Sequence, residues 1–312
     1  MNNIFFVYSF YRFKNIKYKL KLKLHLEKYL KNKLVRGTIL LADEGINGSI
    51  AGKQKILDDT IKQIRKYLKI RKINLKINKI DFLPFNKLKI RTKNEIVSLG
   101  KGKIDVKEFS ASRIKPRDWN KLLERKNLKL IDTRNKYEIK IGKFRGSINP
   151  RTNSFREFPD KLKESKIKKD DEIAIYCTGG IRCEKASAYL KQEGFKKIYQ
   201  LDGGIINYLD YVKKNKVKSK WKGDCFVFDN RVTVNKYLER GYYLQCYGCR
   251  HPISMKETKS IYYKKGISCP HCFKSRTGKQ KKRSISRQKN IENHNIKNES
   301  HTFKKIYYYD LQ

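Results

Sequence analysis

The sequence is short of acidic residues and has no long apolar run. Among its 312 residues, 30 are acidic and 76 are basic, which gives a formal net charge of +46. No stretch approaches the roughly 18 consecutive apolar residues that a membrane-spanning helix needs. The first residues also lack the basic start, apolar stretch and small-residue cleavage site of a secretory signal. We therefore expect a cytoplasmic protein without a membrane span.

Motifs for the common organic redox cofactors are missing as well. No Gly-x-Gly-x-x-Gly motif opens a helix-like segment, as a dinucleotide site would require. The five histidines are scattered along the chain. The sequence thus contains no motif for flavin, haem or nicotinamide.

Positive charge is in excess and is spread along the whole chain. Most of the basic residues are lysine, and Ile, Asn and Tyr are also frequent. The codons of these four residues are rich in A and T, so a biased genome accounts for part of the excess. The basic surface still favours a polyanionic partner. Such a partner is RNA, DNA or an anionic membrane surface, and charge alone does not decide among them.

Changes in pattern divide the chain into four regions. We expect an N-terminal domain at 1–110, a central domain at 115–217, a cysteine-rich lobe at 218–278 and a basic tail at 279–312. The tail has almost no apolar residues, so we expect it to be disordered or to become ordered on RNA. The fold class is a multidomain combination of α+β and α/β.

Strand-like and helix-like runs alternate in the N-terminal region. We expect strands at Ile4–Tyr11, twice within Val35–Gly52, at Ile73–Phe82 and at Leu88–Arg91, and helices at Tyr18–Leu30 and Lys53–Leu68. Leu20 to Leu26 also alternate as in a strand, but the helical interval to Leu30 favours a helix. The order β-α-β-β-α-β predicts a ferredoxin-like domain.

The central region changes to strands that alternate with helices. We expect strands at Leu128–Thr133, Glu172–Cys177 and Ile198–Leu201, and a helix at Glu184–Gln192 that is capped by Gly194. This alternation predicts a parallel sheet with helices on both faces. Functional loops then belong at the carboxyl ends of the strands, where Asp132, Cys177 and Asp202 lie.

A cysteine-containing loop follows the second of these strands. Its residues are Cys177, Thr178, Gly179, Gly180, Ile181, Arg182 and Cys183. The glycines allow successive backbone N–H groups to point inward, and a helix N-terminus and Arg182 add positive charge. All three effects favour the thiolate of Cys177, which is the nucleophilic form. We expect Cys177 and Arg182 to be catalytic and the other five residues to form the active-site loop.

The spacing of this loop resembles that of a rhodanese. Four residues separate Cys177 from Arg182, whereas cysteine phosphatases use five, and the rhodanese cysteine carries a persulfide sulfur. Asp132–Arg134, Tyr137–Glu138 and Ile141–Asn149 resemble further rhodanese segments, with Lys143 where His is common and Ser147 where Ala is common. Two alternatives remain: Cys177 is a buried structural cysteine, and Cys183 either resolves a sulfur adduct or is only a small residue at the helix start.

Motifs along most of the chain resemble one bacterial family. They are Leu41–Gly52, Glu95–Gly100, Phe155–Pro159, Cys177–Lys185, Asp202–Ile206 and Phe226–Asp229. Together they are similar to the signatures of the rhodanese-domain tRNA hydroxylases, from about residue 1 to about residue 275. The resemblance implies oxygen-dependent conversion of the wobble uridine, position 34, to 5-hydroxyuridine, with molecular oxygen as co-substrate and tRNA as partner.

A second cysteine cluster has the spacing of a zinc site. Cys246 and Cys249 form one C-x-x-C pair, and Cys269 and Cys272 form another after 19 residues. Four thiolates suit one tetrahedral, structural zinc ion. The alternatives are a redox pair, unliganded thiols, or a histidine (His251 or His271) in place of one cysteine. Members of the resembled family commonly carry extra cysteines between the pairs, which this chain lacks. We expect Cys225 to be a plain small residue.

Two further features have both a structural and an RNA-binding interpretation. The segment Glu44–Gly48 is typical of a hairpin with Asn47-Gly48 at its turn, and Glu44 remains open as an RNA contact. The tyrosine pairs Tyr242-Tyr243 and Tyr262-Tyr263 lie among lysines, so they either form strand faces or stack on RNA bases.

Three functions are compatible with these patterns. The first is the tRNA hydroxylase with Cys177 as nucleophile. The second is a sulfurtransferase that acts through a Cys177 persulfide, and the third is a non-catalytic RNA-binding module. The N-terminal region and the cysteine-rich lobe favour RNA, because a free-standing sulfurtransferase needs neither.

Overall fold

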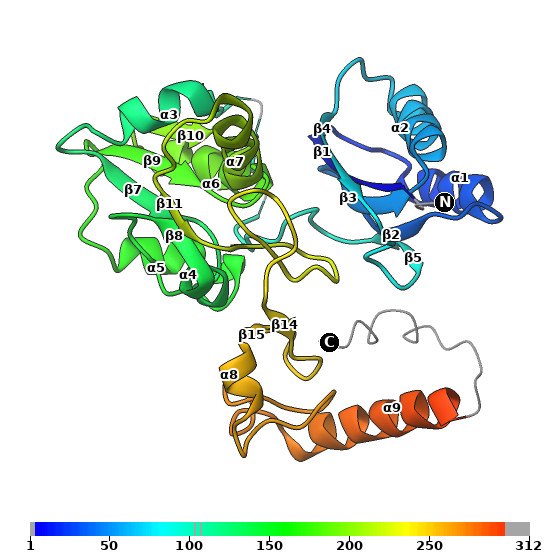
Figure 1. The fold of residues 1–312 in the computed structure, drawn as a ribbon. Coiled ribbons are helices and arrows are strands. Elements are labelled where there is room, and N and C mark those ends of the chain that lie inside the picture. Colours follow the sequence, from blue (N-terminus) through cyan, green and yellow to red (C-terminus); the bar gives the residue numbers. More distant parts are fainter. Residues whose placement is uncertain (1–3, 103, 107, 297–312) are drawn as a thin grey trace. The chain divides into compact units, whose positions relative to one another are not determined.

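The computed structural model describes residues 4–102, 104–106 and 108–296. The chain forms two compact units (Figure 1). The first contains Met1–Cys225 and Lys236–Leu238, and the second contains Phe226–Asn235 and Glu239–Gln312. Among the described helices, none is both long enough and apolar enough to cross a membrane.

The N-terminal part of the first unit is a five-stranded sheet with two helices. Its elements are β1 (Phe5–Phe13), α1 (Lys19–Leu30), β2 (Arg36–Ala42), β3 (Gly45–Gly52), α2 (Gln54–Leu68), β4 (Asn74–Ile80) and β5 (Leu88–Thr92). The strand order is β4-β1-β3-β2-β5. The pairs among β1, β2, β3 and β4 are all antiparallel, whereas β5 pairs with β2 in parallel. The predicted β-α-β-β-α-β order and the ferredoxin-like class are confirmed.

Helix α1 forms although its leucines alternate. Leu22, Leu26 and Leu30 are buried, whereas Leu20 and Leu24 are 62% and 65% exposed. The buried positions are four residues apart, so a helix places all three against the sheet. The sheet core thus selects the helical periodicity over the strand-like one.

The predicted hairpin turn at Asn47-Gly48 is wrong. The strands β2 and β3 are joined through Asp43 and Glu44, and both Asn47 and Gly48 lie inside β3. Asn47 donates to the Ile96 carbonyl at 3.0 Å. A side chain at Gly48 would meet the ring of Phe10, with 2.6 Å between the new Cβ and the ring. Position 48 is glycine because the Phe10 ring packs directly on it, and not because the chain turns there.

The two faces of the N-terminal sheet contact different neighbours. Tyr8 and Phe10 of β1 pack into the core with α1 and α2. Tyr11 and Phe13 follow at odd-numbered positions and point to the opposite face, because side chains alternate along a strand. There they pack with Ile96 and with Ile181 of the cysteine loop.

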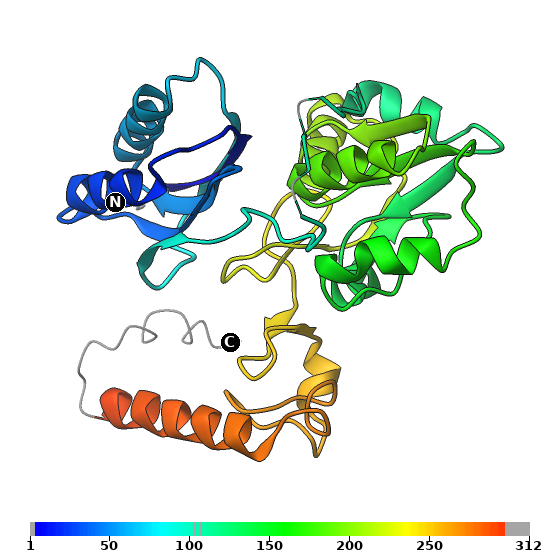
Figure 2. The ribbon, with the colours of Figure 1, turned by 180° about the vertical axis from the view of Figure 1, so that it is seen from behind.

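The central part of the first unit is a parallel sheet of order β6-β10-β9-β7. Its strands are β6 (Ser112–Ile114), β7 (Lys129–Asp132), β9 (Glu172–Tyr176) and β10 (Lys197–Leu201). Its helices are α3 (Pro116–Leu122), α4 (Lys136–Ile141), η1 (Phe155–Glu157), α5 (Phe158–Lys163), α6 (Ile181–Gln192) and α7 (Gly204–Asn215), and β8 (Gly142–Phe144) pairs with β11 (Trp221–Gly223) (Figures 1 and 2).

Two separate cores cover the two faces of this parallel sheet. One contains Phe158 of α5 and Leu190 of α6. The other is aromatic and surrounds Phe144, whose ring contacts those of Trp119, Tyr176, Tyr208 and Trp221. The predicted parallel sheet with helices on both faces is confirmed. Gly194 follows α6 at φ +91°, as its predicted capping role requires.

The second unit is built from short elements and one long helix. They are β13 (Thr233–Val234), β14 (Leu244–Gln245), β15 (Pro252–Ile253), α8 (Met255–Thr258) and α9 (Gly278–Ile296), and β12 (Cys225–Phe226) lies where the chain enters it. Within the region that we assigned to the cysteine-rich lobe, 218–278, Trp221–Gly223 pairs with β8 in a two-stranded sheet that is separate from the parallel one.

The described part of the tail, for which we expected disorder or ordering on RNA, forms helix α9. The side chains of Ser284, Gln288 and Ile291 are buried, and this spacing forms one helical stripe. Thr277 and Gln280 bond reciprocally at the start of the helix. The low apolar content predicted disorder because two of the three buried side chains, Ser284 and Gln288, are polar and do not count as apolar. The remainder, residues 297–312, lies outside the described residues.

Candidate active site

Cys177 directly follows β9 and begins the loop that leads into α6. Its side chain is 1% exposed. The Gly180 N–H donates a hydrogen bond to the sulfur at 3.0 Å. Gly180 has a φ of +101°, a conformation that glycine adopts without strain, and it immediately precedes α6. The glycine backbone and the start of the helix thus supply N–H donors to the sulfur, as expected for a nest.

The surroundings of Cys177 favour its ionised form. Burial raises the pKa of the thiol, but this effect is outweighed by the hydrogen bond with the Cys183 side chain, the charge of Arg182 and the N–H groups of Cys183 and Gly180. Together they lower the pKa of Cys177 from 9.0 to about 5. The sulfur is therefore a thiolate at neutral pH.

Arg182 is held by a carboxylate rather than by the sulfur. Its guanidinium bonds both oxygens of Glu138, at 2.7 and 2.8 Å, and approaches the Thr178 hydroxyl at 3.4 Å. Glu138 is fully buried; burial raises its pKa, but the charge and hydrogen bonds of Arg182 bring the pKa below its usual value. Bidentate pairing fixes the orientation of the guanidinium. The sequence marked Glu138 only as a rhodanese landmark and gave no signal of this role.

Cys183 is the neutral partner of Cys177. It is fully buried, and its pKa is raised well above 9.0 by burial and by the adjacent Cys177 side chain. The Thr133 hydroxyl lies 3.7 Å from its sulfur. A protonated thiol can donate a hydrogen bond to a thiolate. This geometry suits a supporting role and leaves open whether Cys183 also resolves a sulfur adduct.

The remaining loop residues occupy different environments. The Thr178 carbonyl accepts from the Ile206 N–H at 3.2 Å, which ties the loop to α7. Ile181 packs with Tyr11 and Phe13 of β1. A Cβ at Gly179 would meet nothing within 4 Å, so open space lies beside this residue.

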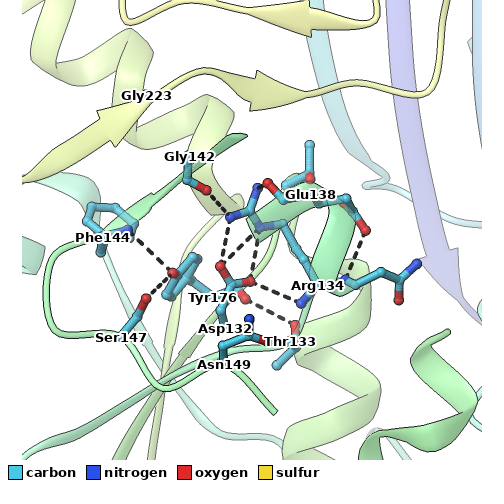
Figure 3. A network of polar contacts seen from close by, with 12 residues as sticks. Asp132, Thr133, Arg134, Glu138, Gly142, Phe144, Ser147, Asn149, Tyr176 and Gly223 are labelled. Carbon is cyan, nitrogen blue, oxygen red and sulfur yellow. Dashed lines mark hydrogen bonds and ion pairs between the residues drawn. The ribbon is translucent and has the colours of Figure 1, made fainter. Parts of the chain in front are cut away.

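A buried polar network includes Tyr176, the residue that precedes Cys177 (Figure 3). Asp132 and Arg134 are both fully buried, with Oδ2 and Nη2 2.7 Å apart. The same guanidinium donates to the Gly142 carbonyl at 2.6 Å. Tyr176 donates to the Ser147 hydroxyl at 2.9 Å, which gives a partner to the serine that stands where alanine is common. Asp132, which we expected at a functional edge, is thus engaged in holding the scaffold.

Glu184, in the first turn of α6, connects the loop to the N-terminal sheet. Its Oε1 accepts from the Tyr11 hydroxyl at 2.6 Å, the Asn74 amide at 3.2 Å and the Arg113 guanidinium at 2.8 Å. Burial raises the pKa of Glu184, and the charge of Arg113 opposes this shift. Strands β1, β4 and β6 therefore converge on one carboxylate next to the reactive cysteine.

Lys185 makes a second connection from the same turn. Its side chain is fully buried, its ammonium lies 2.7 Å from Glu44, and it also pairs with Glu95 and donates to the Val97 carbonyl. Glu44 accepts from the Ile96 N–H at 2.6 Å as well. Both oxygens of Glu44 thus have partners within the protein, which favours the structural interpretation of the Glu44–Gly48 segment.

Cys225 lies closer to the loop than its position in the sequence suggested. It is fully buried, and its side chain bonds that of Thr178. Burial raises the pKa of Cys225 to about 12, so its thiol stays neutral. The sequence offers no local signal for this proximity, because 46 residues separate the two positions.

In the second unit, Cys246, Cys249, Cys269 and Cys272 come together. Their sulfur atoms lie within 4.8 Å of one another. The pairs Cys246–Cys272, Cys249–Cys269 and Cys269–Cys272 are separated by 3.9, 3.8 and 3.8 Å. A tetrahedral ion with metal–sulfur bonds of ~2.3 Å requires sulfur atoms ~3.8 Å apart. The cluster can therefore hold a metal ion.

One alternative metal ligand, His271, is directed at a carboxylate. The His271 Nε2 lies 2.6 Å from the Glu257 carboxylate.

Neither tyrosine pair lies in a strand, which argues against the strand-face interpretation. Tyr242 is 89% exposed, whereas the ring of Tyr262 contacts that of Phe273 at a tilt of 40°, with 4.9 Å between the ring centroids.

Comparison with known proteins relates these sites to one family. Residues 5–96 match the family described as a UPF0176 acylphosphatase-like domain, and residues 115–210 match the rhodanese-like domain. A tRNA uridine(34) hydroxylase of Pelagibacter ubique (strain HTCC1062) is 44% identical over 303 residues, which cover 97% of this chain and 99% of that protein. The chain belongs to the tRNA uridine(34) hydroxylase family. In this family member the rhodanese-like domain carries the Cys177 loop.

Two solved structures with rhodanese names each align with about a third of this hydroxylase family member. A rhodanese-related protein from Thermoplasma volcanium is 26% identical and covers 32% of this chain and 92% of its own, with a TM-score of 0.28. A rhodanese-like domain protein from Staphylococcus aureus is also 26% identical and covers 31% of this chain and 90% of its own, with a TM-score of 0.27.

Proposed function

We propose that this chain hydroxylates the wobble uridine, position 34, of tRNA, with Cys177 as the active-site nucleophile. The observation that carries the proposal is the 44% identity over 97% of the chain to a tRNA uridine(34) hydroxylase. The site supports it, because a thiol with a pKa of about 5 is ionised at neutral pH. Molecular oxygen is the co-substrate that the family resemblance implies, and the cytoplasm is the location where tRNA is available.

In this proposal the loop residues keep the sulfur charged and fixed. Gly180 and Cys183 donate to the thiolate, and Arg182 adds a positive charge whose position is set by Glu138. A nucleophile held in one geometry avoids the entropic cost of orienting it during the reaction. The net charge of +46 supports tRNA as the partner.

We also propose that the four cysteines of the second unit hold one zinc ion. Four thiolates complete a tetrahedral site and leave no open position for catalysis, so the role is structural. The spacing of the sulfur atoms supports this assignment. Such a site supplies folding free energy to a lobe with few apolar residues.

A sulfurtransferase is the second candidate function. The loop of four residues between Cys177 and Arg182 favours it, because this loop resembles that of enzymes that carry sulfur as a persulfide. The N–H donors that face the Cys177 sulfur would also stabilise the anion of a Cys177 persulfide. The two candidates share Cys177 and differ in the nucleoside that they produce.

Nucleoside analysis of tRNA from a deletion strain tests the proposal. Loss of 5-hydroxyuridine derivatives is the expected result, and restoring the wild-type gene returns them. Cys177→Ser abolishes the rescue, because a serine hydroxyl does not ionise in this site, whereas Cys183→Ser lowers it less. Cys225→Ser is the comparison: that buried thiol is neutral but bonds Thr178 of the loop, so we expect a smaller loss of rescue than for Cys177→Ser.

Other outcomes would separate the alternatives. Loss of a thiolated nucleoside with normal 5-hydroxyuridine would identify the sulfurtransferase. An unchanged nucleoside profile in the deletion strain would favour the RNA-binding module. Full rescue by Cys177→Ser would show that Cys177 is not the nucleophile.

A further inference from the structure

One face of the N-terminal sheet brings a lysine to the loop that borders Cys177. In the β1–β4 ladder Tyr11 pairs with Asn74, and Ser9 pairs with Lys76. Residues two positions apart share a face, so Tyr11, Asn74 and Lys76 are all on the face opposite α1 and α2. Tyr11 and Asn74 bond Glu184 of α6. Lys76 extends from the same face toward the neighbouring loop.

The Lys76 ammonium is seated on the loop between β10 and α7. It donates to the carbonyl oxygen of Gly203. The ammonium fits against Gly203 because this residue has no side chain: a Cβ there would lie 2.7 Å from the Lys76 nitrogen. A larger residue at position 203 would therefore displace the ammonium.

The same loop directly contacts the backbone of Cys177. The Ile205 N–H donates to the Cys177 carbonyl at 2.9 Å. A Cβ at Gly204 would lie 2.4 Å from that carbonyl oxygen, so the two segments touch without an intervening side chain. Lys76 is thus one short loop away from the reactive cysteine.

No carboxylate among the described residues lies within 4.0 Å of the Lys76 ammonium. Cys177, Asp202, Asp210 and Cys225 act electrostatically on its pKa, in order of decreasing effect. Burial lowers the pKa of Lys76 to about 8, and the Cys177 thiolate is the largest influence that opposes this shift. A lysine ammonium has three donors, and Gly203 uses one.

We propose that Lys76 is a further residue of the Cys177 site, an ammonium supplied by the N-terminal domain that stabilises the negative charge on this sulfur. The N-terminal domain then completes the active site as well as supporting it. The inference rests on the proposed reactivity of Cys177 and is independent of which nucleoside the enzyme produces. The other titratable groups around Cys177 are the positively charged Arg182 and the neutral side chains of Cys183 and Tyr11.

The pH dependence of Cys177 alkylation tests this proposal. The full-length protein is treated with iodoacetamide between pH 4 and 9, and the peptide that contains Cys177 is quantified by mass spectrometry. Lys76→Gln keeps a donor for the Gly203 carbonyl and removes only the charge. We expect it to raise the midpoint of the profile by about one pH unit and to slow alkylation at pH 5 by about fivefold, as the loss of a nearby opposite charge predicts.

Two variants control for other effects of the substitution. Lys76→Arg keeps the positive charge and retains the wild-type midpoint. Lys79→Gln removes a charge from an exposed position of the same strand and also leaves the midpoint unchanged. A Lys76→Gln midpoint equal to that of the wild type would overturn the proposal, and so would an equal shift in Lys79→Gln.

A reciprocal measurement does not depend on the folding of the Lys76 variants. The titration of Lys76 is followed by NMR in the wild type and in Cys177→Ala. Removing the thiolate lowers the pKa of Lys76, because the coupling between two charges is mutual. An unchanged Lys76 pKa would refute the inference. Neither experiment uses tRNA, so failure of the hydroxylase proposal would appear separately in the nucleoside profile.

Discussion

At the scale of single residues, the charge on Cys177 is decided by a few neighbouring groups. Burial alone would keep the thiol neutral, and the Cys183 side chain, the Arg182 charge and two backbone N–H groups reverse that preference. Glu138 fixes Arg182, so the cation cannot swing away from the loop. The ionised sulfur is thus a property of the folded loop and is lost when the chain unfolds.

This difference between the folded and unfolded states predicts a pH-dependent stability. The pKa of Cys177 is about 5 when folded and ~8.5 in an unfolded chain. Its stabilising contribution is therefore complete above about pH 8.5 and is lost as the pH falls through 5. Relative to Cys177→Ala, the wild type should gain up to ~1.4 kcal/mol of unfolding free energy per pH unit between these values.

Urea unfolding at pH 6 and pH 8 measures this effect. Both tryptophans, Trp119 and Trp221, lie in the aromatic core of the rhodanese-like domain, so their fluorescence reports on the domain that carries Cys177. Cys225→Ala is the control, because the pKa of that thiol is about 12 and it stays neutral at both pH values. A wild-type advantage that is the same at both pH values would contradict the lowered pKa.

At the scale of elements, the first turn of α6 joins the reactive loop to the rest of the first unit. Arg182 pairs with Glu138 of α4, Glu184 bonds Tyr11 of β1, and the buried Lys185 pairs with Glu44. Each charged side chain has a partner from another element. The orientation of α6, and with it the N–H groups that face Cys177, therefore depends on the N-terminal sheet.

Glu44→Gln should weaken this connection. The substitution leaves the buried Lys185 ammonium with one carboxylate, Glu95, and we expect a loss of about 1–3 kcal/mol of unfolding free energy. The adjacent Asp43→Asn is the matched control: Asp43 also pairs with a lysine, Lys19, but its side chain is 68% exposed. Removing an exposed pair costs less than about 1 kcal/mol.

Thermal or urea unfolding of the two variants decides between structural and RNA-binding roles of Glu44. A large loss of stability in Glu44→Gln together with a small one in Asp43→Asn supports the structural role. Equal stability of the two variants, with weaker tRNA binding by Glu44→Gln alone, would favour the RNA contact instead.

At the scale of the whole molecule, the reactive loop and the cysteine cluster belong to different compact units. The first unit has two extended sheets with apolar cores. The cluster in the second unit has only a small apolar surrounding, which includes Ile253 and Leu244. A bound metal ion would thus contribute most of the stability of the lobe around it.

Cys249→Ala should release the metal and loosen residues from about 240 to 275. Elemental analysis of the wild type is expected to find one zinc per chain, and hydrogen exchange should rise in the lobe of the variant. Alkylation of Cys177 remains unchanged, because that loop is built within the first unit. If the lobe contacts tRNA phosphates, affinity for tRNA falls more than reactivity at Cys177.

Two results would contradict the assignment of metal binding to the second unit and of thiol reactivity to the first. A zinc content near zero in protein that was never exposed to chelators would remove the metal site. Equal losses of tRNA affinity and of Cys177 reactivity would indicate a general folding defect. Cys225→Ala, which removes a cysteine outside the cluster, controls for the substitution itself.

Features formed within a few residues, or by a repeated period, could be predicted from the amino-acid sequence. The interval between Cys177 and Arg182 and the two C-x-x-C pairs are local, and the turn of the Cys177 loop follows from the positive φ that Gly180 adopts without strain. The order of strands and helices follows from periodicity, which survives without knowledge of partners. The wrong turn at Asn47-Gly48 marks the limit of local signals, because the register of β3 against β2 depends on which side chains reach the core.

The distant groups that meet at the reactive cysteine could be identified only in the folded chain. Glu138, Glu44, Lys76 and Cys225 carry no local signal of their roles, since each acts through a partner far away in the chain. Helix α9 is a further case, because its buried stripe is apolar only at Ile291 and shows its purpose only against the lobe that covers it. The energy of a charge interaction depends on the distance between the two groups in space. For residues far apart in the chain, that distance is set by the packing of the complete fold.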